Sequence, residues 1–156
     1  MLRLALLVAL AVSASAACAQ DAVAIPLDGH EAHGVTIEGL DARYRSAVHA
    51  DPSLAVFADR PEDVAVAWRA FLGALGEHLA AEGFEWDEPL RGYHRFYFGA
   101  DGRVERVLYH LRGVDADRSA RYGELLASFA NGHRIALEAD EPFAQCSPIV
   151  LAPPAE

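Results

Sequence analysis

The stretch YHRFYFGADGRVERVLYHL, residues 93–111, predicts a β-hairpin. Its first six residues are mostly aromatic, which favours a strand. Asp101-Gly102 then supplies the positive backbone φ that a tight hairpin turn needs. The apolar residues of the return segment are Val104, Val107, Leu108 and Leu111, so their period slips from two to three and indicates a β-bulge. With a three-residue loop, the hairpin pairs Tyr93 with Tyr109 and His94 with Leu108.

Helices are predicted on both sides of this hairpin. A long helix begins at Pro61 and ends before Gly83, with an apolar stripe formed by Val64, Trp68, Phe71, Leu72, Leu75 and Leu79. Asp115 is predicted to cap another helix, whose stripe is Tyr122, Leu125, Leu126 and Phe129. A shorter helix is predicted within residues 35–52, from the spacing of Leu40, Tyr44, Ala47 and Val48.

Two further strands are predicted, at residues 135–137 and 146–151. Pro148 interrupts the second, which favours an edge position because proline has no N–H to donate. Strands separated by a helix and joined partly by a hairpin favour the α+β class. We therefore expect a small antiparallel sheet, made of hairpin 93–111 and one or more C-terminal strands, with helices packed on one face.

The first 19 residues are typical of a secretory signal peptide. Arg3 precedes a short apolar core at residues 4–12, and small residues follow. Cleavage after Ala19 gives a periplasmic or secreted protein; alternatively Cys18 is lipidated and anchors an outer-membrane lipoprotein. The rest is expected to form a flexible lead-in at 20–35, a single domain at 36–151 and a tail at 152–156. Without Cys18, Cys146 is the single cysteine, and we expect it to be buried.

The chain is acidic, with a net charge of −10, and every basic residue is Arg. The sequence shows no basic patch, so we expect no nucleic-acid partner. Attraction to an anionic membrane surface is equally disfavoured. Membrane contact is therefore expected only if Cys18 is lipidated.

Residues 96–111, followed by a helix and a final strand, resemble the C-terminal domain of TonB-type energy transducers. Asp101 to Val104 match the turn of that family, and Val107 stands where the family places an aliphatic residue. The resemblance covers residues 62–151 and implies the order helix, strand, strand, helix, strand. The Pro-rich spacer of those transducers is missing here, so the resemblance does not extend to energy transduction. The chain also resembles small secreted proteins of Bacteroidota-type bacteria in its F-x-W (Phe84, Trp86), R-F-Y-F and F-A-Q-C-S-P segments.

Aromatic residues and histidines are the candidates for a ligand site between the sheet and the long helix: Trp68, Trp86, Tyr93, His94, Tyr109 and His110. His30 and His33 form an H-x-x-H pair, but structural zinc needs four ligands, so we expect two surface histidines and no metal. The sequence contains no G-x-S-x-G, Walker or Rossmann motif. We therefore expect no catalytic residue and no cofactor.

These observations favour a non-enzymatic domain that binds a protein or peptide partner. The predicted mode is strand addition to a sheet edge, at residues 147–151 or 93–98. The acidic surface favours basic partners. Two alternatives remain: a small-ligand carrier with an aromatic pocket, and a small hydrolase that uses Cys146 or a His-bound metal.

Overall fold

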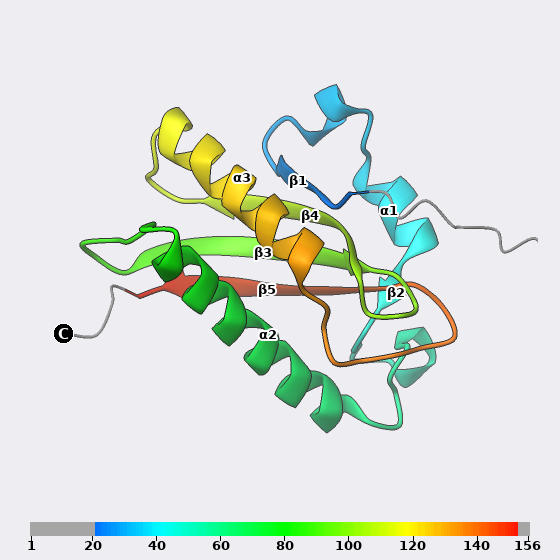
Figure 1. Cartoon of the computed structure of the whole chain (residues 1–156). Helices are drawn as coiled ribbons and strands as arrows, with labels where there is room; N and C mark the ends of the chain where they lie inside the picture. The colour runs from blue at the N-terminus through cyan, green and yellow to red at the C-terminus, as the bar shows by residue number, and fades with distance from the viewer. Residues whose placement is uncertain (1–20, 153–156) are drawn as a thin grey trace, which may run out of the picture.

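The structure, a computed structural model, describes residues 21–152 and confirms the α+β class. Within these residues a five-stranded sheet has the order β1-β4-β3-β5-β2 (Figure 1). The predicted signal peptide and Cys18 lie outside the described residues, as does most of the predicted tail. The strands are β1 (Val23–Pro26), β2 (Arg45–Ser46), β3 (Leu90–Phe98), β4 (Val104–Leu111) and β5 (Phe143–Leu151). The helices are α1 (Ile37–Arg43), α2 (Pro61–Ala81) and α3 (Ala116–Gly132), with short 3-10 helices at His30–His33 and Pro52–Leu54.

The predicted hairpin is confirmed as the antiparallel pair of β3 and β4. The predicted bulge lies at Glu105, because Phe98 pairs with Val104 whereas Tyr97 pairs with Arg106. The predicted register therefore holds beside the turn and is wrong beyond the bulge, where one extra residue shifts β4. His94 lies opposite Tyr109, and Tyr93 lies opposite His110. Because neighbouring side chains of a strand point to opposite faces, these two pairs lie on opposite faces of the sheet.

Helix α2 packs on one face of the sheet, as predicted (Figure 1). It begins at Pro61, whose missing N–H has no partner in a first turn anyway. Its apolar stripe is buried against the central strand. The ring of Phe71 packs edge-on to Phe96 and Phe98, with ring centroids 5.2 and 5.5 Å apart.

Helix α3 covers the same face beside α2 (Figure 1). The Asp115 side chain accepts a hydrogen bond from the Arg118 amide at 2.8 Å, so the predicted cap is confirmed. The ring of Phe129 packs against Phe71, with ring centroids 5.1 Å apart. The two helices and the sheet therefore share one apolar core.

The sheet is mixed and not purely antiparallel, because the N-terminal part of the chain adds a strand at each end. β1 pairs parallel with β4, and β2 pairs parallel with β5. The segment expected as a flexible lead-in, residues 20–35, therefore contributes a strand to the sheet. Strands of four and two residues leave no alternation long enough to be recognised in the sequence.

The helix predicted within residues 35–52 is shorter than expected, since α1 ends at Arg43. Tyr44 is buried against Tyr97 and donates a hydrogen bond to Glu105 at 2.5 Å. These tertiary contacts favour an extended backbone after α1. They belong to a small cluster on the second face of the sheet, made of Ile25, Val35, Tyr44, Tyr97, Leu108 and Ala144.

The strand predicted at residues 135–137 is not formed. Ile135 and Leu137 are buried, as apolar residues in the core should be. The chain here runs past the hairpin turn instead of joining the sheet: the Ile135 amide donates to the Gly102 carbonyl at 3.0 Å. Ile135 and Leu137 are therefore apolar because they are buried under the turn, and not because they pair in a strand.

Candidate functional site

β5 has an outer edge that no other strand covers over most of its length. β3 pairs with β5 from Phe143 to Leu151 on the inner side. On the outer side β2 reaches only Phe143 and Ala144, and no other strand of residues 21–152 pairs there. The predicted edge at residues 147–151 is thus confirmed. The predicted edge at 93–98 is wrong, because β3 lies between β4 and β5.

The backbone groups of the outer edge follow from the pairing with β2. The Ala144 carbonyl accepts a hydrogen bond from the Ala47 amide at 2.7 Å, so Ala144 faces outward. Backbone groups of alternate residues in a strand point to the same edge, so Cys146, Pro148 and Val150 also face outward. Cys146 and Val150 each present an N–H and a C=O, whereas Pro148 presents only its C=O.

An apolar groove of about 470 Å³ lies between this edge and α2. The wall from β5 consists of consecutive residues, 148–152. Because successive side chains point to opposite faces, a wall of consecutive residues means that the groove runs along the edge of the strand itself. The other lining residues are Leu72, Leu75, Gly76, Leu79, Ala80, Phe84, Glu85, Trp86 and His94.

His94 is the buried histidine in the wall of the groove, and its side chain is 0 % exposed. Its Nε2 lies 2.6 Å from the hydroxyl of Tyr122. Burial raises the pKa of Tyr122 and lowers the pKa of His94 to about 3, so both groups are neutral at neutral pH. Tyr122 has no other hydrogen-bond partner among the described residues, so we infer that its O–H donates to Nε2. The hydrogen of the imidazole is then on Nδ1, which has no partner there either.

Trp86 supplies a second buried N–H in the same wall. Its indole nitrogen has no hydrogen-bond partner among the described residues. The ring is held by Phe84, with ring centroids 4.9 Å apart, and by the Arg118 guanidinium 4.2 Å from its centroid. A mostly apolar groove with a few fixed polar groups is typical of a binding site.

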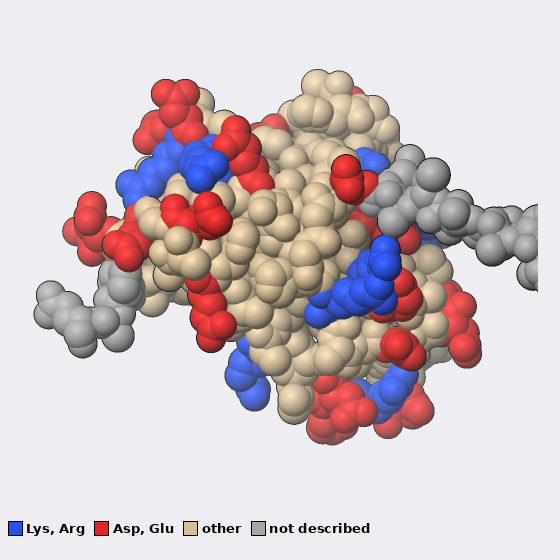
Figure 2. Space-filling view, viewed as in Figure 1, with Lys and Arg blue, Asp and Glu red and all other residues tan. Residues whose placement is uncertain are grey.

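An acidic segment of the chain, residues 82–88, contributes to the wall of the groove. Glu85 lines it, and Glu82, Asp87 and Glu88 are exposed in the same loop region. Figure 2 shows acidic side chains together with basic ones at the end of the molecule where α2 finishes. Among residues 21–152, Glu85 is the one charged side chain that lines the groove, and together with the net charge of −10 it favours cationic groups in a ligand.

The remaining predicted site residues do not line this groove. Trp68 packs in the core beside it and donates to the Ser147 hydroxyl at 3.2 Å, and Tyr109 donates to the Ser119 carbonyl at 3.0 Å. Tyr93 and His110 lie on the second face, where His110 Nδ1 is 2.9 Å from Asp28. Trp86 and His94 are thus the two predicted residues that the fold brings together.

The apolar lining of the groove cannot be predicted from the sequence. Leu72, Leu75 and Leu79 belong to the predicted helical stripe, and such a stripe has the same spacing whether it is covered or lines a groove. Tyr122 likewise belongs to a predicted stripe, and its hydrogen bond to His94 joins residues 28 positions apart. No local signal in the sequence reports either role.

Cys146 and the H-x-x-H pair form no reactive centre within residues 21–152. Cys146 is exposed, not buried as predicted, because it points to the second face, away from His94. The His30 ring contacts the Leu27 carbonyl at 2.7 Å, and no group of three metal-ligating side chains occurs in this range. A thiol–imidazole pair therefore has no support in the geometry.

Comparisons of the chain with family models, curated proteins and solved structures return no match. No helix of the described residues has the length and apolar character needed to cross a membrane.

Proposed function

We propose that this protein binds an extended peptide segment, which adds as a strand to the outer edge of β5. The observation that carries the proposal is that this unpaired edge forms one wall of an apolar groove. Backbone hydrogen bonds to the edge would supply affinity, and the groove would select the side chains.

The position of β2 limits where the segment lies. β2 already occupies the outer side at Phe143 and Ala144. The segment therefore pairs along residues 146–151, a length of about 20 Å at 3.3 Å per residue. Pro148 removes one donor from this edge, and the Gln145 side chain reaches the Cys146 carbonyl at 3.3 Å. Val150 is thus the residue with the most accessible pair of backbone groups.

The groove and its rim specify the chemistry of the segment. Alternate side chains of a paired strand face the groove and are expected to be apolar, because its lining is mainly Leu, Ile and aromatic. The intervening side chains point away from the groove towards solvent, and the net charge of −10 on the chain favours Lys or Arg there. The preferred partner is therefore a basic, alternating segment of another protein.

Two glycines of α2 provide a matched test. Gly76 lines the groove and Gly73 does not, and a Cβ added at either position meets no atom within 4 Å. Gly76→Leu and Gly73→Leu should favour the helix alike, but only Gly76→Leu fills the groove. We expect Gly76→Leu to weaken binding of an alternating Val-Arg peptide at least tenfold, with Gly73→Leu within twofold of the wild type. The probe has about ten residues, the length of a strand, and tryptophan fluorescence of the full chain reports binding.

Amide hydrogen exchange identifies how the peptide is bound. Strand addition should slow exchange of the Val150 amide, which faces the outer edge. If the peptide protects other amides and leaves Val150 unchanged, or if both glycine variants bind alike, the proposal is wrong.

The same variants test the ligand-carrier alternative, which the unpaired N–H groups of His94 and Trp86 favour. A small apolar ligand in the groove should also be displaced by Gly76→Leu. It should leave exchange of the Val150 amide unchanged, since it does not pair with the edge. The exchange measurement therefore separates the two functions.

A further inference from the structure

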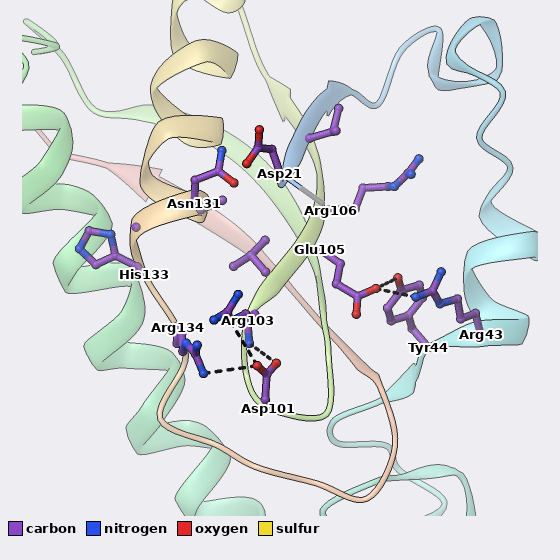
Figure 3. A pocket seen from close by; sticks show the side chains of 14 residues that line it. Asp21, Arg43, Tyr44, Asp101, Arg103, Glu105, Arg106, Asn131, His133 and Arg134 are labelled. Atoms are coloured by element: carbon purple, nitrogen blue, oxygen red, sulfur yellow. Dashed lines mark hydrogen bonds and ion pairs between the residues drawn. The ribbon is translucent and has the colours of Figure 1, made fainter. Parts of the chain in front are cut away.

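A second groove, of about 840 Å³, gathers arginine side chains far from the peptide edge (Figure 3). It lies between the hairpin turn, the end of α3, the start of β1 and the end of α1. Its charged lining residues are Arg43, Arg103, Arg106, Arg134, Asp21, Asp101 and Glu105. Arginines thus outnumber carboxylates here, although the whole chain carries a net charge of −10.

Arg103 and Arg134 lie opposite each other, so two positively charged side chains are close together. Their backbones form an isolated antiparallel bridge, which places the two residues directly opposite. Like charges opposite each other across a strand pair are destabilising. The two guanidinium groups therefore favour an anion between them.

Asp101 occupies this position with a single carboxylate oxygen. Oδ2 lies 3.3 Å from Arg103 Nε and 3.3 Å from Arg134 Nη1 (Figure 3). Both distances are longer than the 2.7–2.9 Å of a strong charge-assisted bond, and all three side chains are half exposed. One carboxylate shared by two guanidinium groups leaves an excess positive charge.

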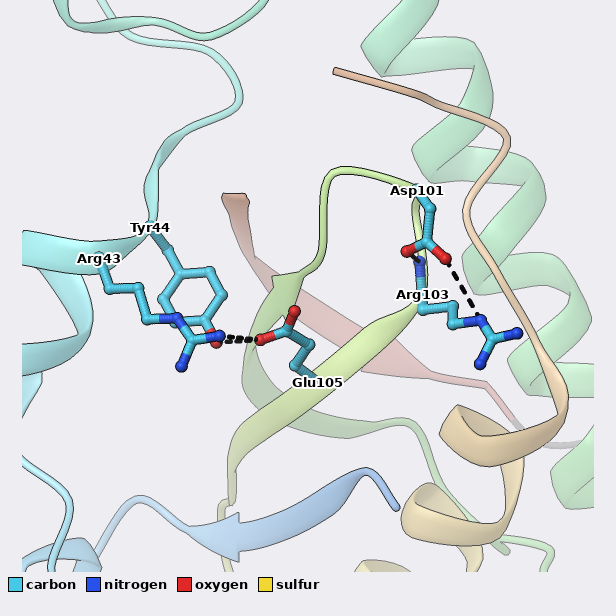
Figure 4. A network of polar contacts seen from close by, with 5 residues as sticks. All are labelled: Arg43, Tyr44, Asp101, Arg103 and Glu105. Atoms are coloured by element: carbon cyan, nitrogen blue, oxygen red, sulfur yellow. Dashed lines mark hydrogen bonds and ion pairs between the residues drawn. The ribbon is translucent and has the colours of Figure 1, made fainter. Parts of the chain in front are cut away.

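The other arginines of the groove are arranged differently. Arg43 is neutralised, because Glu105 accepts from it at 2.7 Å and from Tyr44 at 2.5 Å (Figure 4). Arg106 and Asp21 both line the groove and form no ion pair within residues 21–152, so their charges offset each other. The excess positive charge is therefore located at Arg103 and Arg134, which share the single Asp101 carboxylate.

We propose that this groove binds an oxyanion, the phosphate or carboxylate group of a small molecule, between Arg103 and Arg134. The bound group takes the position of the Asp101 carboxylate. Guanidinium groups suit such a ligand because their paired donors match two of its oxygens. This site is independent of the proposed peptide edge.

Asp101→Asn gives the sharpest test. Asn keeps the Oδ1 acceptor for the Arg103 amide of the turn and removes the competing charge. In NMR titrations of the full chain with inorganic phosphate at constant ionic strength, we expect saturable shifts of the Arg103 and Arg134 side-chain N–H signals. Asp101→Asn should tighten binding at least threefold, and Arg134→Gln should weaken it at least fivefold.

Two matched variants separate a site from a general charge effect. Glu88→Gln and Arg69→Gln change exposed residues outside the groove by the same charges, and both should stay within twofold of the wild type. If Glu88→Gln tightens binding as much as Asp101→Asn, the proposal is overturned. Succinate in place of phosphate distinguishes a carboxylate ligand from a phosphate ligand. Absence of saturable shifts with both anions also overturns the proposal.

Discussion

Gly102 meets two requirements in the turn between β3 and β4. Its φ of +74° disfavours a residue with a Cβ, and an added Cβ would lie 2.5 Å from the Ile135 carbonyl oxygen and 2.6 Å from that of Leu137. Gly113 has a similar φ of +72° but open space around it. Comparing Gly102 with Gly113 therefore separates the free-energy cost of a Cβ at positive φ from the cost of its steric clash with residues 135 and 137.

We expect Gly113→Ala to lower the free energy of unfolding by about 1–2 kcal/mol, the cost of a Cβ at positive φ. Gly102→Ala should lower it by about 1–3 kcal/mol more, because the turn must also move away from residues 135–137. Urea unfolding of both variants measures the difference. Equal effects would mean that the chain after α3 adapts freely to the turn.

His94 should make stability depend on pH. Its pKa is about 3 in the folded protein because of burial, against an ordinary value of 6.5. Between these values the unfolded chain binds the proton and the folded protein does not. Stability is therefore retained above pH 6.5 and lost as pH falls towards 3, by at most about 1.4 kcal/mol per pH unit.

His94→Gln isolates this contribution from that of the carboxylates. Gln retains an acceptor for the Tyr122 hydroxyl but does not titrate. Between pH 6.5 and 4 the free energy of unfolding of the variant should fall less steeply than that of the wild type. Parallel pH profiles would show that His94 is protonated in both states or in neither.

One side chain, that of Asp115, caps the N-terminus of helix α3. The Asp115 carboxylate accepts from the Arg118 amide at 2.8 Å. Asp115→Ala should lower the free energy of unfolding by about 1 kcal/mol, because the first turn loses this partner. Thermal unfolding measures the effect, with Asp87→Ala as the control, since Asp87 is exposed and lies outside the helices. Equal effects of the two changes would exclude a capping role.

The elements that the sequence predicts well are those with local signals. α2 has Pro61 and a long stripe, α3 has Asp115, and the hairpin has Asp101-Gly102. Tyr44 shows why the N-terminal part differs. Its spacing suits a helix, but its contacts with Tyr97 and Glu105, more than fifty positions away, favour an extended chain.

The candidate site was predictable only in part, for the same reason. Trp86 and His94 are candidates for a ligand site because of their residue types, and Pro148 indicates an edge of the sheet. The bulge at Glu105 decides which face each residue of β4 occupies beyond it, and thereby places Tyr109 opposite His94 and His110 opposite Tyr93. A one-residue shift of this kind depends on the packing of the whole sheet.

Charge is distributed unevenly over the molecule, and this distribution cannot be predicted from the sequence. Arg103, Arg106 and Arg134 come from two segments that only the fold brings to one groove. Glu85, in the acidic segment after α2, lines the other groove. The two grooves are therefore expected to attract ligands of opposite charge, although the net charge of the chain is −10.

This asymmetry predicts how salt affects the proposed peptide binding. The acidic rim should steer a Val-Arg peptide to the groove, and such steering is screened once the Debye length falls well below 10 Å. Raising the salt concentration from about 0.05 to 0.5 M should therefore slow association at least tenfold in stopped-flow fluorescence. An alternating Val-Ser peptide, which pairs with the same edge without charge, should change less than twofold. A similar response of both peptides would place the partner's charges away from Glu82, Glu85 and Glu88, and would leave the apolar groove and the strand edge as the sole determinants of binding.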